Sequence, residues 1–136
     1  MSQTQYQTTF VRFFEDAIGG GALDILDEVL DRNVVHHSQP TTGVSPAEAI
    51  RKHIADIRKA FLDYRTKVHD MLVDGDRLAA RCTVYGTKPG DGSPGSAKPF
   101  AMDEILIVKF KEGRICDIWN VADRLSLMQQ IGALPR

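Results

Sequence analysis

The chain has 136 residues, of which 43% are hydrophobic and 26% are charged, and its net charge at pH 7 is -1. This length fits one domain over residues 1–136, and the composition is that of an ordinary globular protein. Lys and Arg are scattered rather than clustered, so no nucleic-acid partner is expected. No apolar run approaches the ~20 residues needed to cross a bilayer, so no membrane partner is expected either.

The cysteines and the N-terminus predict a cytoplasmic location. Cys82 and Cys116 are the two cysteines, and both fall within predicted strands. The stretch Met1–Gln7 is polar and lacks the apolar segment of a signal peptide. We therefore expect a cytoplasmic protein with two reduced, buried thiols.

Two helices are predicted near the N-terminus. Residues Gln5–Ile18 place aromatic side chains at helical spacing, and Gly19–Gly21 end that pattern. Ala22–Leu30 is a second, shorter helix with apolar residues along one side. Asn33–His37 is then a short extended segment that ends before Pro40.

A third helix has a clear start signal. Ser45 is suited to cap it, Pro46 suits the first helical position, and Glu48 follows three residues after the cap. The helical pattern ends near Asp63. Its apolar stripe consists of Ile50, Ile54, Ile57 and Phe61.

The second half of the chain predicts an antiparallel meander and a last short helix. The expected strands are Thr66–Val73, Leu78–Tyr85, Phe100–Phe110 and Ile115–Asp123, and the helix runs from Arg124 to about Ile131. Turn signals at Asp74–Asp76 and Glu112–Gly113 join the first and the last strand pair. Residues 86–99 form a long loop rich in Gly, Pro and Ser, which is a candidate lid.

This order of elements predicts the fold class. Helices come first and strands follow, which indicates an α+β fold with the N-terminal helices packed on one face of a curved antiparallel sheet. A sheet curled around helices leaves a cone-shaped cavity, and such a cavity is a natural site for a small ligand.

Pairing the last two strands predicts which side chains face inward. If Glu112–Gly113 is a two-residue loop, Phe110 faces Ile115. The further predicted pairs are Leu106 with Trp119, Glu104 with Val121, and Met102 with Asp123. Alternation then gives one mostly apolar, and hence inner, face: Met102, Glu104, Leu106, Val108, Phe110, Ile115, Asp117, Trp119, Val121 and Asp123.

Two carboxylates near one end of this face suggest chemistry. Burial against apolar side chains raises the pKa of a carboxyl group, and a second carboxylate nearby raises it further. Glu104 or Asp123 could then act as a general acid or base near neutral pH. Asp123 also directly precedes the last helix, so it could instead be the N-cap, and the two roles are compatible.

The other hairpin and the histidines supply further candidates. A Gly75–Asp76 loop puts Arg81 and Tyr85 on one face with Asp70, where a buried Arg81 would need an anionic partner and an exposed Arg81 would not. His36 and His37 are adjacent in an extended segment, so we expect one imidazole in the pocket wall and the other outside. The histidine spacing fits no zinc pattern, and no metal site is predicted.

Several short motifs resemble those of the SnoaL-like polyketide cyclases, in an order and spacing that cover nearly the whole chain. They are Val34–His37 followed by Gly43, Phe61–Asp63, Gly75–Asp76 followed by Arg81, Thr83 and Gly86–Thr87, Glu112–Ile115 followed by Asp117, Trp119 and Asp123, and finally Gln129–Gly132.

The resemblance implies the cone-shaped fold of nuclear transport factor 2-like proteins, also called a cystatin-like α+β roll, as a homodimer or homotetramer. It also implies ring closure by an intramolecular aldol reaction that needs no metal or cofactor. In that chemistry a single Asp on the last strand is the acid/base, and Asp123 is the residue that matches it.

Residues and resemblance together predict a cofactor-independent cyclase or isomerase that acts next to a carbonyl of a small apolar organic substrate. Asp123 would move the proton, and His37, Arg81 or Trp119 would hold the substrate and stabilise enolate charge. The predicted catalytic residues are Asp123 and His37, and the predicted substrate-binding residues are Trp119, Arg81, Tyr85, Met102, Glu104 and His36.

Two alternatives remain open. One is an epoxide hydrolase of the same fold, in which Arg81 with Asp123 and Glu104 would imitate an Asp-Arg-Asp arrangement around a water molecule. The other is a non-catalytic module for small-ligand binding or dimerisation, in which Asp123 would be engaged only in capping and would titrate as an ordinary acid.

Overall fold

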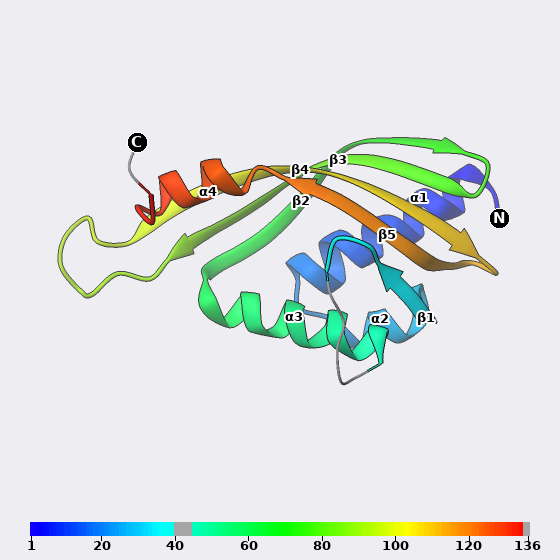
Figure 1. The fold of residues 1–136 in the computed structure, drawn as a ribbon, viewed down its shortest axis with the longest axis horizontal. Helices are drawn as coiled ribbons and strands as arrows, with labels where there is room; N and C mark the ends of the chain where they lie inside the picture. Colours follow the sequence, from blue (N-terminus) through cyan, green and yellow to red (C-terminus); the bar gives the residue numbers. More distant parts are fainter. Residues whose placement is uncertain (40–44, 135–136) are drawn as a thin grey trace.

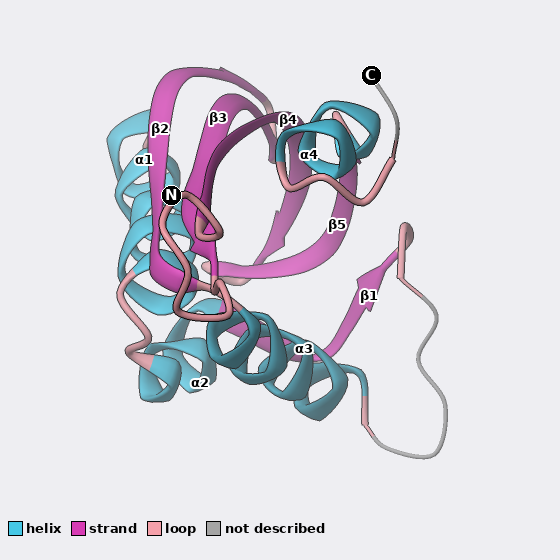
Figure 2. Cartoon of the chain, turned by 90° about the vertical axis from the view of Figure 1, so that its left-hand side faces the viewer, coloured by secondary structure: helices cyan, strands magenta, loops and turns pink. Residues whose placement is uncertain are grey.

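The computed structural model describes residues 1–39 and 45–134, in which helices pack on one face of a strongly curved sheet (Figures 1 and 2). Gly43, which contributes to the family resemblance, lies outside the described residues. No helix among the described residues is long and apolar enough to span a bilayer.

The first predicted helix is confirmed, with a change of winding inside it. α1 (Gln3–Val11) continues directly into a π-helical segment, η1 (Arg12–Gly19). Ser2 and Gln5 form a capping box at its start, and this satisfies backbone donors that the first turn leaves free. The phenylalanines of this helix, Phe10, Phe13 and Phe14, are buried in the core, and Tyr6 packs against it partly buried.

The other helices follow the sequence signals closely. The predicted Ala22–Leu30 helix is a 3-10 turn, η2 (Leu23–Ile25), joined to α2 (Leu26–Val29). α3 (Pro46–Ala60) begins as expected, because the Ser45 hydroxyl accepts a hydrogen bond from the Glu48 backbone N–H. α4 (Arg124–Gln130) is capped by Asp123.

The sheet has the order β1-β5-β4-β3-β2. Its strands are β1 (Leu30–His36), β2 (Leu62–Asp74), β3 (Arg77–Lys88), β4 (Lys98–Lys111) and β5 (Arg114–Ala122). β1 runs parallel to β5, and the other neighbours are antiparallel. The four predicted meander strands are confirmed, although β2, β3 and β4 are longer than expected and shorten the predicted 86–99 loop.

The two faces of the sheet differ in character. The concave face packs on η1 and α3, and its core includes Leu78, Val108, Ile115 and Ile118, all fully buried (Figure 2). The convex face keeps large apolar side chains exposed, among them Leu72, Ile105, Ile107 and Val121.

The oligomeric state that the family resemblance implies, a homodimer or homotetramer, stays a prediction.

The β2–β3 hairpin has the register that the sequence predicts. Leu72 pairs with Ala79 across the Gly75–Asp76 loop. On the same convex face Arg81 Nε donates a 2.6 Å hydrogen bond to Asp70 Oδ2, and both side chains are more than half exposed. The solvent-facing interpretation of Arg81 is therefore the correct one.

The β4–β5 hairpin departs from the predicted register at one residue. Phe110 pairs with Ile115 as expected, but Lys109 pairs with Asp117, so Cys116 is an extra residue in a β-bulge. Each later residue of β5 is therefore shifted by one and changes face. Cys116 itself is only partly buried, whereas Cys82 is buried as predicted.

The bulge overturns three predicted pairs. Leu106 lies opposite Asn120 rather than Trp119. Glu104 lies opposite Ala122 rather than Val121, which instead pairs with Ile105. In place of the predicted pair of Met102 with Asp123, Met102 pairs with Val84 of β3, and Asp123 follows the end of β5. The inner residues of β5 beyond the bulge are thus Ile118 and Asn120, and the predicted inner positions of Asp117, Trp119 and Val121 were wrong.

Candidate functional site

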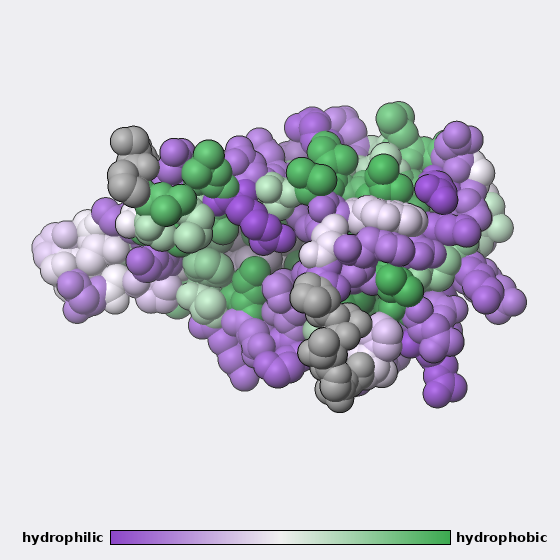
Figure 3. Space-filling model, viewed as in Figure 1, coloured by the Kyte–Doolittle hydropathy of each residue, from purple (hydrophilic) through white to green (hydrophobic). Residues whose placement is uncertain are grey.

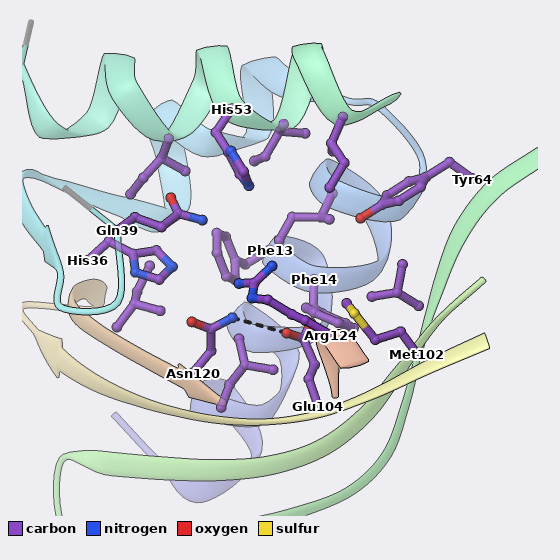
Figure 4. Close-up of a pocket in the computed structure, with 17 residues that line it drawn as sticks. Phe13, Phe14, His36, Gln39, His53, Tyr64, Met102, Glu104, Asn120 and Arg124 are labelled. Carbon is purple, nitrogen blue, oxygen red and sulfur yellow. Dashed lines mark hydrogen bonds between the residues drawn. The ribbon is translucent and has the colours of Figure 1, made fainter. Parts of the chain in front are cut away.

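The concave face, η1 and α3 enclose a cavity of about 80 Å³ (Figure 4). Its walls are mainly apolar, with side chains such as Phe13, Phe14, Ile54, Val84 and Leu106. Polar groups converge on this apolar surface from β1, α3, β4, β5 and the start of α4. Such a combination of an apolar wall and a few directed polar groups is typical of a small-molecule site.

The carboxylate of Glu104 is the central polar group. Glu104 is 8% exposed, because it alternates with buried apolar residues along β4. Burial raises its pKa, and this is partly offset by a hydrogen bond from Asn120 and by the positive charge of Arg124. No described Lys, Arg or His forms an ion pair with it.

Asn120 orients Glu104 and brings an unused acceptor to the cavity. Its Nδ2 donates a 3.1 Å hydrogen bond to Glu104 Oε2 (Figure 4). Its Oδ1 is buried and has no hydrogen-bond partner within residues 1–39 and 45–134. A buried acceptor without a partner costs free energy, which a hydroxyl or amino donor on a ligand would recover.

Basic side chains lie at the mouth of the cavity. His36 ends β1, His53 comes from α3, and Arg124 is the first residue of α4 (Figure 4). Burial, with smaller contributions from nearby positive groups, lowers the pKa of His36 to about 4. The pKa of His53 is lowered by burial and then by the charge of Arg124. Both imidazoles are therefore neutral at pH 7.

Tyr64, near the start of β2, adds a phenol at the far end of the cavity (Figure 4). Burial, reinforced by the negative charge of Glu104, raises its pKa to about 12. Its hydroxyl therefore stays protonated and can donate a hydrogen bond to a ligand oxygen.

Three of the eight predicted site residues line this cavity, namely His36, Met102 and Glu104. Asp123 instead caps α4, because its Oδ1 accepts a 3.0 Å hydrogen bond from the Ser126 backbone N–H. Asp123 lines a shallow groove that Arg81 also borders and that shares Glu104 with the cavity, but Asp123 itself does not line the cavity. Tyr85 lies on the convex face beneath the guanidinium of Arg65. The catalytic role of Asp123 stays a prediction without a contact to the cavity.

The other predicted residues, His37 and Trp119, belong to a cluster on the convex side. Their rings are stacked at 4.4 Å between centroids, and Arg77 lies over the Trp119 ring. His37 Nε2 donates a 2.9 Å hydrogen bond to Asp117 Oδ1, and the Cys116 thiol donates to the other oxygen. As expected, His36 and His37 point to opposite sides, with His36 in the cavity wall.

Sequence reasoning missed Asn120, His53 and Arg124 as site residues. Asn120 faces inward only because of the bulge at Cys116. His53 and Arg124 belong to different helices, and their approach depends on the curvature of the sheet between them. Among residues 1–39 and 45–134 no group of three His, Cys, Asp or Glu side chains is arranged to hold a metal ion.

The fold is a nuclear transport factor 2-like α+β cone with its cavity between sheet and helices. The sequence model of the SnoaL-like polyketide cyclases matches residues 8–131. The chain therefore belongs to the SnoaL-like polyketide cyclase family. It has no significant match among curated proteins.

Solved structures share this fold. TsrD from Streptomyces laurentii is 26% identical, with a TM-score of 0.85 over 98% of this chain and 99% of that one. IdmH from Streptomyces antibioticus is 24% identical, with a TM-score of 0.78 over 93% and 97%. A SnoaL-like polyketide cyclase from Agrobacterium tumefaciens is 24% identical, with a TM-score of 0.70 over 86% and 91%.

Proposed function

We propose that this protein is a cofactor-independent cyclase or isomerase that moves a proton next to a carbonyl group of a small organic substrate. The observation that carries the proposal is the carboxylate of Glu104, which is 8% exposed in an apolar cavity and has no cationic side chain in ion-pair contact among the described residues. Burial raises its pKa toward the range in which a carboxyl group exchanges protons at neutral pH.

The arrangement supports a proton-transfer mechanism. Asn120 holds Oε2 of Glu104, which leaves Oε1 as the base. Ionised Glu104 removes the proton from the carbon beside the carbonyl, and the electron pair of that C–H bond forms an enolate. The hydroxyl of Tyr64 is a donor available to the enolate oxygen.

The second half of the reaction depends on the substrate. In a cyclase, the enolate carbon attacks a second carbonyl of the same molecule, and protonated Glu104 gives its proton to the new alkoxide. In an isomerase, the same proton returns to another carbon of the enolate. Both outcomes regenerate the ionised carboxylate and need no further reactant, so the cavity residues suffice for either.

Glu104 takes the role that the sequence assigned to Asp123. Asp123 is exposed and engaged in the cap of α4, whereas Glu104 is buried in the cavity wall. A general base must be within reach of the substrate proton, and this geometric requirement favours Glu104. The hydrolase alternative is not favoured, because Arg81 pairs with Asp70 on the convex face.

The test is proton exchange from the carbon next to a carbonyl, measured by proton NMR in D₂O with a panel of small aryl ketones. We expect Glu104→Gln to lower the exchange rate by about 100-fold or more. Asp123→Asn is the matched control, and it should stay within a few-fold of wild type. Equal rates for wild type and Glu104→Gln would refute the proposal and favour a non-catalytic binding module.

A further inference from the structure

We propose that the cavity mouth is an anion subsite, in which Arg124, His53 and His36 bind the carboxylate of a small organic acid whose apolar body extends inward toward Glu104. This deepens the proposed function, on which it rests for the assignment of the reacting end. The acid group is the part of the substrate that the mouth recognises, and a carbonyl deeper in the cavity is the part that reacts.

Geometry is the first support. The three basic side chains come from β1, α3 and α4, and they converge on one end of the cavity (Figure 4). Within residues 1–39 and 45–134, Arg124 forms no ion pair with a carboxylate. Its guanidinium therefore keeps a planar fork of donors free for a carboxylate.

The charges around the mouth are the second support. Positive charge on His53, His37 or Arg124 lowers the pKa of His36. His53 faces Arg124 and, on its own helix, Asp56. Glu104, which is buried in the cavity wall, is an acidic group whose pKa the charge of Arg124 lowers. A bound carboxylate would supply negative charge among these bases and raise the pKa of both imidazoles, so binding should take up protons.

Cavity size and the free acceptor define the rest of the ligand. An apolar cavity of roughly 150 Å³ is known to accept benzene. At about 80 Å³ this cavity encloses only part of such a ring, so a one-ring ligand extends to the mouth. Asn120 Oδ1 then offers an acceptor to a hydroxyl or enol on the ligand. The fitting class is a small cyclic or aromatic keto acid.

The basic groups at the cavity mouth differ in their surroundings from charged groups elsewhere on the surface. Figure 3 shows hydrophilic side chains over much of the molecular surface, so surface charge alone does not define a site. The mouth differs because its basic groups border an apolar cavity. Arg114 at the start of β5 is exposed, is absent from the cavity lining, and serves as a matched control cation.

The test uses benzoate and its neutral isostere benzamide, with binding followed by nitrogen–proton correlation NMR. Wild type should bind benzoate about tenfold or more tightly than benzamide, as charge-assisted hydrogen bonds require. Arg124→Gln should remove this preference, and Arg114→Gln should retain it. Calorimetry at pH 7 in two buffers of different ionisation enthalpy should show proton uptake that His53→Asn reduces.

The outcomes separate this proposal from the proposed function. Equal affinity for the two probes, no binding of either, or an unchanged preference in Arg124→Gln would overturn the subsite. Glu104→Gln removes a negative charge, so it should bind benzoate at least as tightly as wild type while losing proton exchange. If Glu104→Gln keeps full exchange but the benzoate preference stands, the proposed chemistry fails and the subsite remains.

Discussion

Two carboxylates on the β4–β5 hairpin face opposite sides of the sheet and have opposite pKa shifts. Glu104 lies on the concave face, where burial raises its pKa more than the hydrogen bond from Asn120 and the charge of Arg124 lower it. Asp117 lies on the convex side, where partial burial acts to raise its pKa but hydrogen bonds from His37 and Cys116 lower it overall.

The contrast shows that the face, rather than the residue type, decides what a carboxylate can do here. The concave side supplies an apolar wall, whose burial of the carboxylate favours a proton-exchanging acid and outweighs the opposing hydrogen bond from Asn120. The convex side supplies basic groups, which favour a permanently ionised one. The single extra residue at Cys116 decides which β5 side chains belong to which side.

Inserting one Ala between Asp117 and Ile118 should have the largest effect. The register before the insertion is held by the bulge, so the insertion would move Ile118 to the convex side and bring Trp119 inward, and the core would lose a fully buried side chain. We expect a loss of more than about 4 kcal/mol and no cooperative transition in a circular dichroism melt. Cys116→Ala keeps the residue count and should still melt cooperatively. A wild-type melting curve for the insertion would contradict the assignment of the two faces.

Replacing one side chain on each face by Ala compares how much the two faces contribute to the free energy of unfolding. Ile118 is 0% exposed and Val121 is 79% exposed, although both lie on β5 beyond the bulge. Ile118→Ala should lower the free energy of unfolding by about 2–5 kcal/mol, because it leaves a cavity. Val121→Ala should change it by less than about 0.5 kcal/mol. Urea unfolding measures both, and similar losses would mean that the faces are assigned wrongly.

The hydrogen bond between His37 and Asp117 on the convex side should contribute least. Asp117→Asn removes the partner of His37, and the expected loss at pH 7 is at most about 1 kcal/mol because the pair is partly exposed. The folded-state pKa of Asp117 lies below its model-compound value of 3.8, so its stabilisation is present above that value. It is lost as the pH falls through the folded-state pKa. Thermal melts should therefore converge for both proteins at low pH, and a constant difference would contradict this account.

The sequence was sufficient for the fold because its signals are local. The Ser45 cap, the Gly75–Asp76 turn and the Glu112–Gly113 turn each depend on a few neighbouring residues, and the structure has all three. The family resemblance added the cone shape, which the sequence model of the family and the solved structures support.

The site was predictable only up to the bulge. Met102 and Glu104 belong to β4, whose alternation has no interruption from Pro99 to Lys111, and both face the cavity as predicted. Trp119 comes after Cys116, so the same rule of alternation gave it the wrong face. Cys fits a regular strand as well as a bulge, and tertiary packing of the hairpin decides between them.

The pKa of Glu104 tests the central claim most directly. Carbon NMR of the labelled side-chain carboxyls, with Glu104 identified by its absence in Glu104→Gln, would follow Glu104 and Asp117 in one titration. This account predicts a pKa above 4.5 for Glu104 and below 3.8 for Asp117. A pKa at or below 4.5 for Glu104 would contradict the claim that the concave face holds the proton-exchanging carboxylate.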